Sequence, residues 1–176
     1  MPISSPEADP LAGTPAQSGC FSPTYRTMPK ARIAAEFTGA SADETEAAFY
    51  EALQAADIEL LMACWSDDED VVCVHPGGPR IVGLAAIRST FDSIFSNGSI
   101  QAKPENVRKV QGLSSAVHNV MERVDVMTPS GPVQAYVLAT NVYHQTVHGW
   151  RMVAHHASPG NQSEVQEIHQ VPQVLH

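Results

Sequence analysis

The chain has 176 residues, 43% of them hydrophobic, and a formal net charge of −9 from 19 acidic and 10 basic side chains. This length suits one domain of ordinary size, and the hydrophobic share is sufficient for a core. The excess of negative charge repels phosphate backbones, so we expect no nucleic-acid partner. Glycine and proline follow no period, which excludes coiled-coil and collagen-like classes.

The cysteines and the apolar runs indicate where the protein resides. Cys20, Cys64 and Cys73 are odd in number and form no CxxC motif, which argues against a disulfide framework and fits a reducing compartment. The N-terminus lacks the charged region and apolar run of a secretory signal. No apolar run approaches the roughly 20 residues that a membrane span needs. We therefore expect a cytoplasmic protein with no membrane association.

The two ends of the chain differ in composition from its middle. Prolines recur throughout residues 1–40 among small and polar side chains, a pattern that predicts a flexible arm. Residues 160–176 are mainly polar and contain a proline, which predicts a tail. The domain itself is expected over residues 41–159.

Two helices are predicted in the first half of this domain. The first spans about 41–65 and begins at Ser41-Ala42-Asp43-Glu44, which has the spacing of a capping box. The second spans about 84–95. In both helices apolar side chains recur at helical spacing and form one face. Those residues are Phe49, Leu53, Leu60 and Cys64 in the first helix, and Leu84, Ile87, Phe91 and Ile94 in the second.

Strands are predicted between and after the helices. A short strand over 70–75 ends at the turn Pro76-Gly77-Gly78-Pro79. Beyond the second helix the hydrophobic period changes to two, and strands are expected over 107–113, 116–127, 133–147 and 150–157. Helices followed by an antiparallel meander predict an α+β fold, with helices packed on one face of a curved sheet.

The motifs of common cofactor and nucleophile sites are missing from the sequence. It contains no phosphate loop, dinucleotide fingerprint or nucleophile elbow, and we therefore expect no cofactor. No metal site is expected either, because His155 and His156 are adjacent on a predicted strand and diverge to opposite faces. His118 and Glu122 share one face of another predicted strand, which we interpret as a solvated or interfacial face.

Several short motifs follow one another in an order that resembles a known family. They are Ala52-Leu53, Asp57, Trp65, Asp67-Asp68, His75-Pro76 and Gly83-Leu84-Ala85-Ala86-Ile87, followed by the closing segment 150–158. This order resembles SnoaL-like and ketosteroid-isomerase-like proteins of the nuclear-transport-factor-2-like superfamily. The resemblance implies a cone-shaped fold, with a curved sheet around helices, a pocket at the open end, and a homodimer formed through the sheet.

The resemblance also suggests candidate site residues. It places His75 where such isomerases carry a general base, but Phe49 stands where they carry an oxyanion-donating tyrosine. Only one of His155 and His156 can face the pocket, and a two-residue turn at His148-Gly149 would pair Asn141 with His156. Each candidate also has a structural interpretation as a core, capping or interface residue. The candidate ligand-binding residues are Tyr50, Asp57, Trp65, Phe91, Asn141, Tyr143, His155 and His156.

Two functions remain open on the sequence. One is a non-catalytic binding or oligomerisation module with a pocket for a small, largely apolar molecule. The other is a small-molecule isomerase, dehydratase or cyclase that uses His75 as a general acid or base, because an unperturbed histidine titrates near neutral pH. The fold alone cannot decide between them, since one fold supports many chemistries.

Overall fold

The computed structural model describes residues 37–161, so the predictions for residues 1–36 and 162–176 lie outside the described residues. Three helices precede most of the sheet: α2 (Ala42–Ala55), α3 (Ile58–Ala63) and α4 (Leu84–Phe95). The strands are β1 (Val72–Val74), β2 (Arg80–Val82), β3 (Ala102–Gln111), β4 (Ser115–Thr128), β5 (Gly131–Thr146) and β6 (Gly149–Gly160). The predicted α+β class is confirmed.

The first predicted helix is in fact two helices. Ser41 caps α2 as expected, since its Oγ accepts a hydrogen bond from the Glu44 backbone N–H at 3.0 Å. The helix ends at Ala56, which has a positive φ of 53°. Asp57 then caps α3 by accepting from two backbone N–H groups. Apolar spacing continues across this break, and for this reason periodicity alone predicted one helix.

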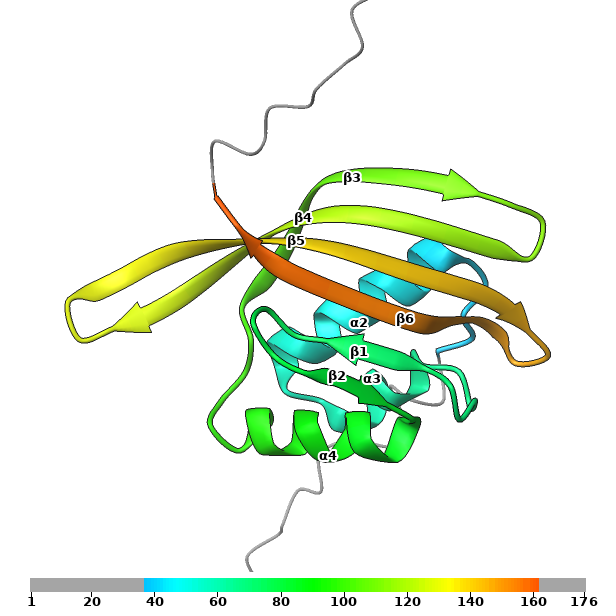
Figure 1. Ribbon diagram of the computed structural model, residues 1–176, viewed down its shortest axis with the longest axis horizontal. Coiled ribbons are helices and arrows are strands. Elements are labelled where there is room, and N and C mark those ends of the chain that lie inside the picture. Colours follow the sequence, from blue (N-terminus) through cyan, green and yellow to red (C-terminus); the bar gives the residue numbers. More distant parts are fainter. Residues whose placement is uncertain (1–36, 162–176) are drawn as a thin grey trace, which may run out of the picture.

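The six strands form one sheet in the order β2-β1-β6-β5-β4-β3. All neighbours are antiparallel except β1 and β6, which are parallel. Figure 1 shows the long strands β3 to β6 curving beside α2, with the short strands β1 and β2 close to α3 and α4. The short strand β2, which follows the turn after His75, was not predicted from the sequence.

The predicted pairing of β5 with β6 is wrong by one residue. The turn residues are Val147 and His148, because Thr146 pairs with Gly149, and a bulge between Val142 and Tyr143 then shifts the register. Asn141 consequently lies opposite His155 rather than His156. The bulge also places His155 on the buried face, whereas His156 is exposed. Bulges have no strong sequence signature here, so alternation could not reveal this one.

The core lies between the helices and the inner face of the sheet. Among its fully buried side chains are Phe49, Leu61, Phe91, Tyr143 and Met152. Residues 37–40, assigned to the arm by composition, also contact this domain. Phe37 packs against the core, and the Trp150 backbone N–H donates to the Gly39 carbonyl at 2.7 Å.

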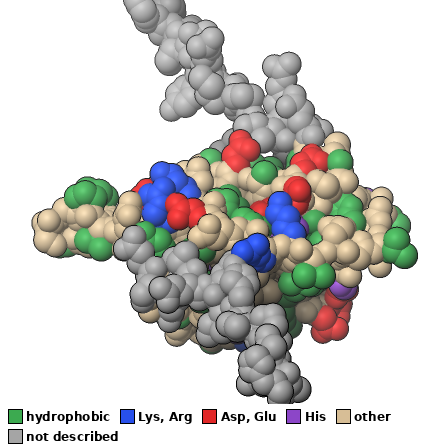
Figure 2. Space-filling view, turned by 90° about the horizontal axis from the view of Figure 1, so that it is seen from above, with side chains coloured by type: hydrophobic (Ala, Val, Ile, Leu, Met, Phe, Trp, Pro, Cys, Tyr) green, Lys and Arg blue, Asp and Glu red, His purple; other side chains and the backbone are tan. Residues whose placement is uncertain are grey.

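The far end of the β4–β5 hairpin projects beyond the rest of the sheet (Figure 1). Strand β6 pairs with β5 only as far as Tyr136, so the last part of the hairpin is a two-stranded ribbon. Hydrophobic side chains lie on its surface (Figure 2), including Val126, Met127 and Val133. Within residues 37–161, no helix is long and apolar enough to cross a membrane.

Candidate functional site

A cavity of about 210 Å³ lies between α2, α4 and the inner face of the sheet. Its walls are mainly apolar, and three polar side chains, His75, Glu122 and His155, interrupt them. The remaining lining residues are Phe49, Leu53, Pro76, Phe91, Ile100, Ala102, Val124, Ala135, Val137 and Ala157. Such a hollow, apolar with a few polar groups, has the composition of a small-molecule site.

Glu122 is a buried carboxyl group on the inner face of β4. The Tyr50 hydroxyl on α2 donates to its Oε1 at 2.8 Å. Burial raises the pKa of Glu122 to about 7, the hydrogen bond from Tyr50 opposes this rise, and the charge of Glu46 adds to it. A carboxyl group in this range can either hold or release a proton near neutral pH.

His155 is the one of the two adjacent histidines that faces the cavity. Its Nδ1 lies 2.7 Å from the Oδ1 of Asn141, and the Phe49 ring packs against it with centroids 5.4 Å apart. An amide oxygen only accepts, so His155 carries its proton on Nδ1, which leaves Nε2 as the acceptor nitrogen. Burial lowers the pKa of His155 to about 3, with smaller contributions from His75 and His156, so the ring is neutral at physiological pH.

His75 lies where β1 ends and the chain turns. The Gly78 backbone N–H donates to the His75 carbonyl at 2.9 Å, and Gly77 has a φ of 72°, which favours glycine. The imidazole packs edge-on against Phe91, and its Nε2 lies 3.7 Å from the Cys73 Sγ. Burial lowers the pKa of His75, so this ring is also disposed to be neutral.

The structure brings together some of the predicted site residues and separates others. His75, Phe91 and His155 line the cavity. Tyr50 and Asn141 stand behind it and hold Glu122 and His155 by hydrogen bonds. These five positions therefore form one connected site.

The other predicted residues lie away from this cavity. Tyr143 is buried further along β5, where its hydroxyl donates to Glu46 at 3.4 Å. Asp57 caps α3, and His156 is exposed. Trp65 is buried beside a different surface hollow, next to Phe37 and Arg151.

Glu122 is the site residue that the sequence interpretation missed. The expectation of a solvated or interfacial face for His118 and Glu122 is wrong, because their exposed fractions are 0% and 6%. Val120 lies between them on the same face and is fully buried. An apolar residue between two titratable ones was the signal that this face of the strand points inward.

The site offers a carboxyl group that titrates near neutrality, two imidazoles disposed to be neutral, and apolar walls. Together these groups could hold the polar end of an apolar molecule or move a proton on it. Within the described part of the chain, no group of three or more His, Cys, Asp or Glu side chains could hold a metal ion.

Comparisons with known proteins place this arrangement in a family. A protein from Thiobacillus denitrificans, provisionally named a calcium/calmodulin-dependent protein kinase type II association domain, is 32% identical. Its TM-score is 0.65, and the match covers 72% of this chain and 100% of that one. A protein of the NTF2-like family from Streptomyces avermitilis, provisionally named a dehydratase, is 30% identical with a TM-score of 0.61. That match covers 66% of this chain and 92% of the other.

A third similar structure shows the same fold at low identity. It is an NTF2-like protein with a cystatin-like fold from Novosphingobium aromaticivorans, 17% identical with a TM-score of 0.59, matched over 76% of this chain and 90% of that one. A comparison with curated proteins finds no significant match. The family model described as the SnoaL-like domain matches residues 43–162, which include every residue of the cavity. The chain therefore belongs to the SnoaL-like domain family.

Proposed function

We propose that this protein binds a small, largely apolar molecule that carries one polar group. The observation that supports this function is the apolar cavity of about 210 Å³ in which Glu122, His75 and His155 are the polar lining residues. The cavity opens to solvent beside the exposed residues Pro76 and Ala135, so a ligand can enter it.

The size of the cavity limits the ligand. An apolar cavity of roughly 150 Å³ accommodates benzene, so this one suits a single substituted ring or a compact aliphatic molecule. The polar group of that molecule would meet Glu122 or His155. Tyr50 occupies one oxygen of Glu122, which leaves the second oxygen for the ligand, whereas His155 offers an acceptor nitrogen.

The probe p-cresol, one ring with one hydroxyl group, tests this proposal. We expect saturable chemical-shift changes in the methyl groups of Val137 and Ala157 when p-cresol is added to the full chain. Ala157→Leu, which fills the cavity, should abolish these changes in Val137. The control is Ala154→Leu on the same strand, which lies outside the cavity wall. Shifts that are unsaturable, or that persist unchanged in Ala157→Leu, would contradict the proposal.

A second candidate function is proton transfer on the bound molecule, as in an isomerase, dehydratase or cyclase. The observation that favours it is the pKa of Glu122, which burial raises to about 7. The similar protein from Streptomyces avermitilis, provisionally named a dehydratase, lends further support. In this reaction Glu122 would take or give the proton, and His75 would be the second acid or base.

Deuterium exchange separates this reaction from simple binding. A molecule extracted from the purified protein is incubated with the full chain in D2O and examined by mass spectrometry. Catalysis predicts deuterium incorporation or loss of water, both reduced by Glu122→Gln and by His75→Asn. Incorporation at the same rate in these variants would exclude the assigned roles, and an unchanged molecule would leave binding as the function.

We also propose that a second copy of the chain covers the outer face of the sheet. No described helix packs on that face, and Tyr136, Leu138 and Val142 lie half-buried on it, with Val117 more exposed. Light scattering of the full chain should give the mass of two chains, and Leu138→Glu should reduce it to one. Val82→Glu at the edge strand β2 is the control. A mass of one chain for the unaltered protein would refute the dimer.

A further inference from the structure

We propose that Glu46 and His118 form a positioning pair that modulates the proton affinity of the cavity carboxyl group Glu122. The pair lies outside the cavity and is not needed to line it. This inference rests on the proposed function, because it assigns the pair a task only in so far as Glu122 serves the ligand.

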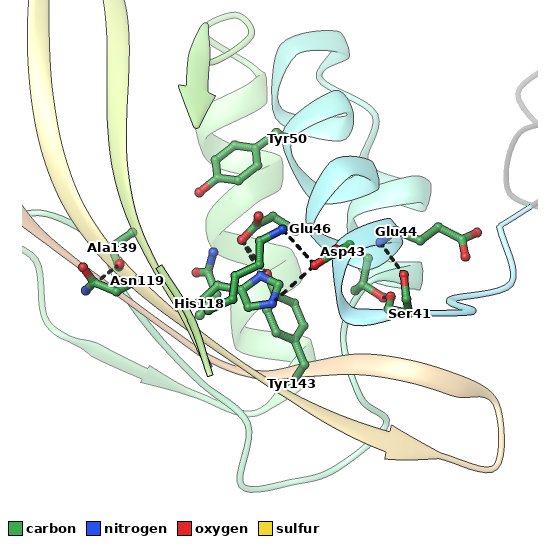
Figure 3. A network of polar contacts seen from close by, with 12 residues as sticks. Ser41, Asp43, Glu44, Glu46, Tyr50, His118, Asn119, Ala139 and Tyr143 are labelled. Atoms are coloured by element: carbon green, nitrogen blue, oxygen red, sulfur yellow. Dashed lines mark hydrogen bonds and ion pairs between the residues drawn. The ribbon is translucent and has the colours of Figure 1, made fainter. Parts of the chain in front are cut away.

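Two buried polar contacts join the same helix to the same strand. In the first, Glu46 Oε2 on α2 lies 2.9 Å from His118 Nδ1 on β4. In the second, Tyr50 on α2 donates to Glu122 on β4 at 2.8 Å. Glu46 and Tyr50 are one helical turn apart, and His118 and Glu122 lie on one face of the strand, so the two contacts are neighbours. Figure 3 shows Glu46, His118 and Tyr50 in the space between α2 and the sheet.

Side chains from β5 lie between the two contacts. The Tyr143 hydroxyl donates to Glu46 at 3.4 Å, and its ring packs on His118 with centroids 4.9 Å apart. Burial raises the pKa of both Tyr50 and Tyr143, and the nearby Asn141 side chain acts in the opposite direction on both. Asn141 therefore lies close to Tyr50 and to Tyr143, and its Oδ1 contacts His155 of the cavity.

The pair is buried, and among residues 37–161 it meets charged side chains at its outer end. His118 Nε2 lies 3.6 Å from Asp43, which in turn pairs with Lys109 of β3 at 3.0 Å. Both of these outer side chains are exposed, and the surrounding water weakens their effect on the core. The charge of Glu46 itself has no such screening.

The titratable groups near Glu122 come from three elements and the turn after β1. They are Tyr50 and Glu46 on α2, Cys73 on β1, His75 in the turn and His155 on β6. His75 and His155 resist protonation because burial lowers the pKa of each. The charge of Glu46 adds to the rise that burial causes in the pKa of Glu122. Among these groups, Glu46 is therefore the one whose negative charge raises the proton affinity of Glu122.

A purely structural pair would stabilise the fold without moving the titration of Glu122. The two roles are separated by carbon NMR of glutamate carboxyl groups in the full, ligand-free chain, with Glu122→Gln to assign the signal. In Glu46→Gln the midpoint of Glu122 should fall by about one pH unit, because one nearby negative charge is removed. The control Glu51→Gln removes the same charge from an exposed position on the same helix and should leave the midpoint unchanged. An unchanged midpoint in Glu46→Gln, or an equal shift in the control, would overturn the proposal.

A reciprocal measurement needs no change in the pair itself, which guards against misfolding of Glu46→Gln. Linked groups influence each other equally, so the ring nitrogens of His118 should show an inflection at the midpoint of Glu122. Nitrogen NMR should find this inflection in the unaltered chain and not in Glu122→Gln. The same profile in both proteins would refute the coupling. Neither measurement uses a ligand, so failure of the proposed binding function would not affect their outcome.

Discussion

The two ends of the space between α2 and the sheet share α2 and β4 but are filled differently. At one end, Glu46, His118 and Tyr143 fill the space with hydrogen-bonded side chains. At the other end, Glu122 and His155 border a cavity. Polar groups are buried at both ends, so burial of a polar group does not by itself mark a ligand site. The open volume beside the polar groups is the distinguishing feature.

The filled end should be the more costly to disrupt. Glu46→Ala leaves His118 and Tyr143 without their hydrogen-bond partner, and each unsatisfied buried group costs about 1–3 kcal/mol. We expect the free energy of unfolding to fall by about 3 kcal/mol, measured by urea denaturation. Glu51→Ala on the exposed face of α2 should change it by less than about 0.5 kcal/mol. Equal losses in both variants would show that the filled end contributes no special stability.

The hollow end should give the protein an unusual dependence on pH. The pKa of Glu122 is raised from 4.5 to about 7 in the folded chain, so the folded chain binds more protons than the unfolded chain between these values. This contribution to stability is present at low pH and is lost as pH rises from about 4.5 to about 7. His155 acts in the opposite sense, because its pKa is lowered from 6.5 to about 3. Its contribution is lost as pH falls through that window.

The variant Glu122→Gln isolates the first of these effects. Relative to the unaltered chain, its free energy of unfolding should increase by about 2–3 kcal/mol between pH 4.5 and pH 7. Denaturation at a series of pH values gives this difference directly. A difference that stays constant over this range would mean that Glu122 has an ordinary pKa and that its burial has no electrostatic consequence.

Two buried alanines allow the same substitution to be compared in a filled region and beside the cavity. Ala139 and Ala157 are buried and lie opposite each other on β5 and β6, but only Ala157 lines the cavity. Overpacking a filled region costs about 1–3 kcal/mol, so Ala139→Leu should lower the free energy of unfolding by that amount. Ala157→Leu has open volume to enter and should cost less than about 1 kcal/mol. Equal costs, measured by denaturation, would indicate that the cavity is closed in solution.

The smallest effect is expected at the exposed end of the polar row. Lys109 and Asp43 form an ion pair at 3.0 Å with both side chains largely in solvent, and such pairs contribute about 0–1 kcal/mol. Lys109→Ala should therefore change the free energy of unfolding by about 0.5 kcal/mol or less. A loss of more than about 2 kcal/mol in the free energy of unfolding would show that this outer ion pair helps to stabilise His118.

The sequence predicted the fold more fully than the site, for physical reasons. Hydrophobic periods of 3.6 and 2 identify helices and strands, and α4 has the bounds that were predicted. The inward side chains of a strand follow from local alternation only until a bulge interrupts it. The bulge between Val142 and Tyr143 contributes to the pairing of Asn141 with His155 rather than with the expected His156. Glu122 was missed because its role depends on Tyr50, which is 72 positions away in the chain.

The most direct test of the binding site is a crystal structure of the protein purified from its source organism. We expect density for a small molecule in the cavity, with a polar atom within hydrogen-bonding distance of Glu122 or His155. A cavity closed by movement of Phe49 and Phe91, with Glu122 bonded only to protein groups, would contradict the central claim that the hollow end is a ligand site.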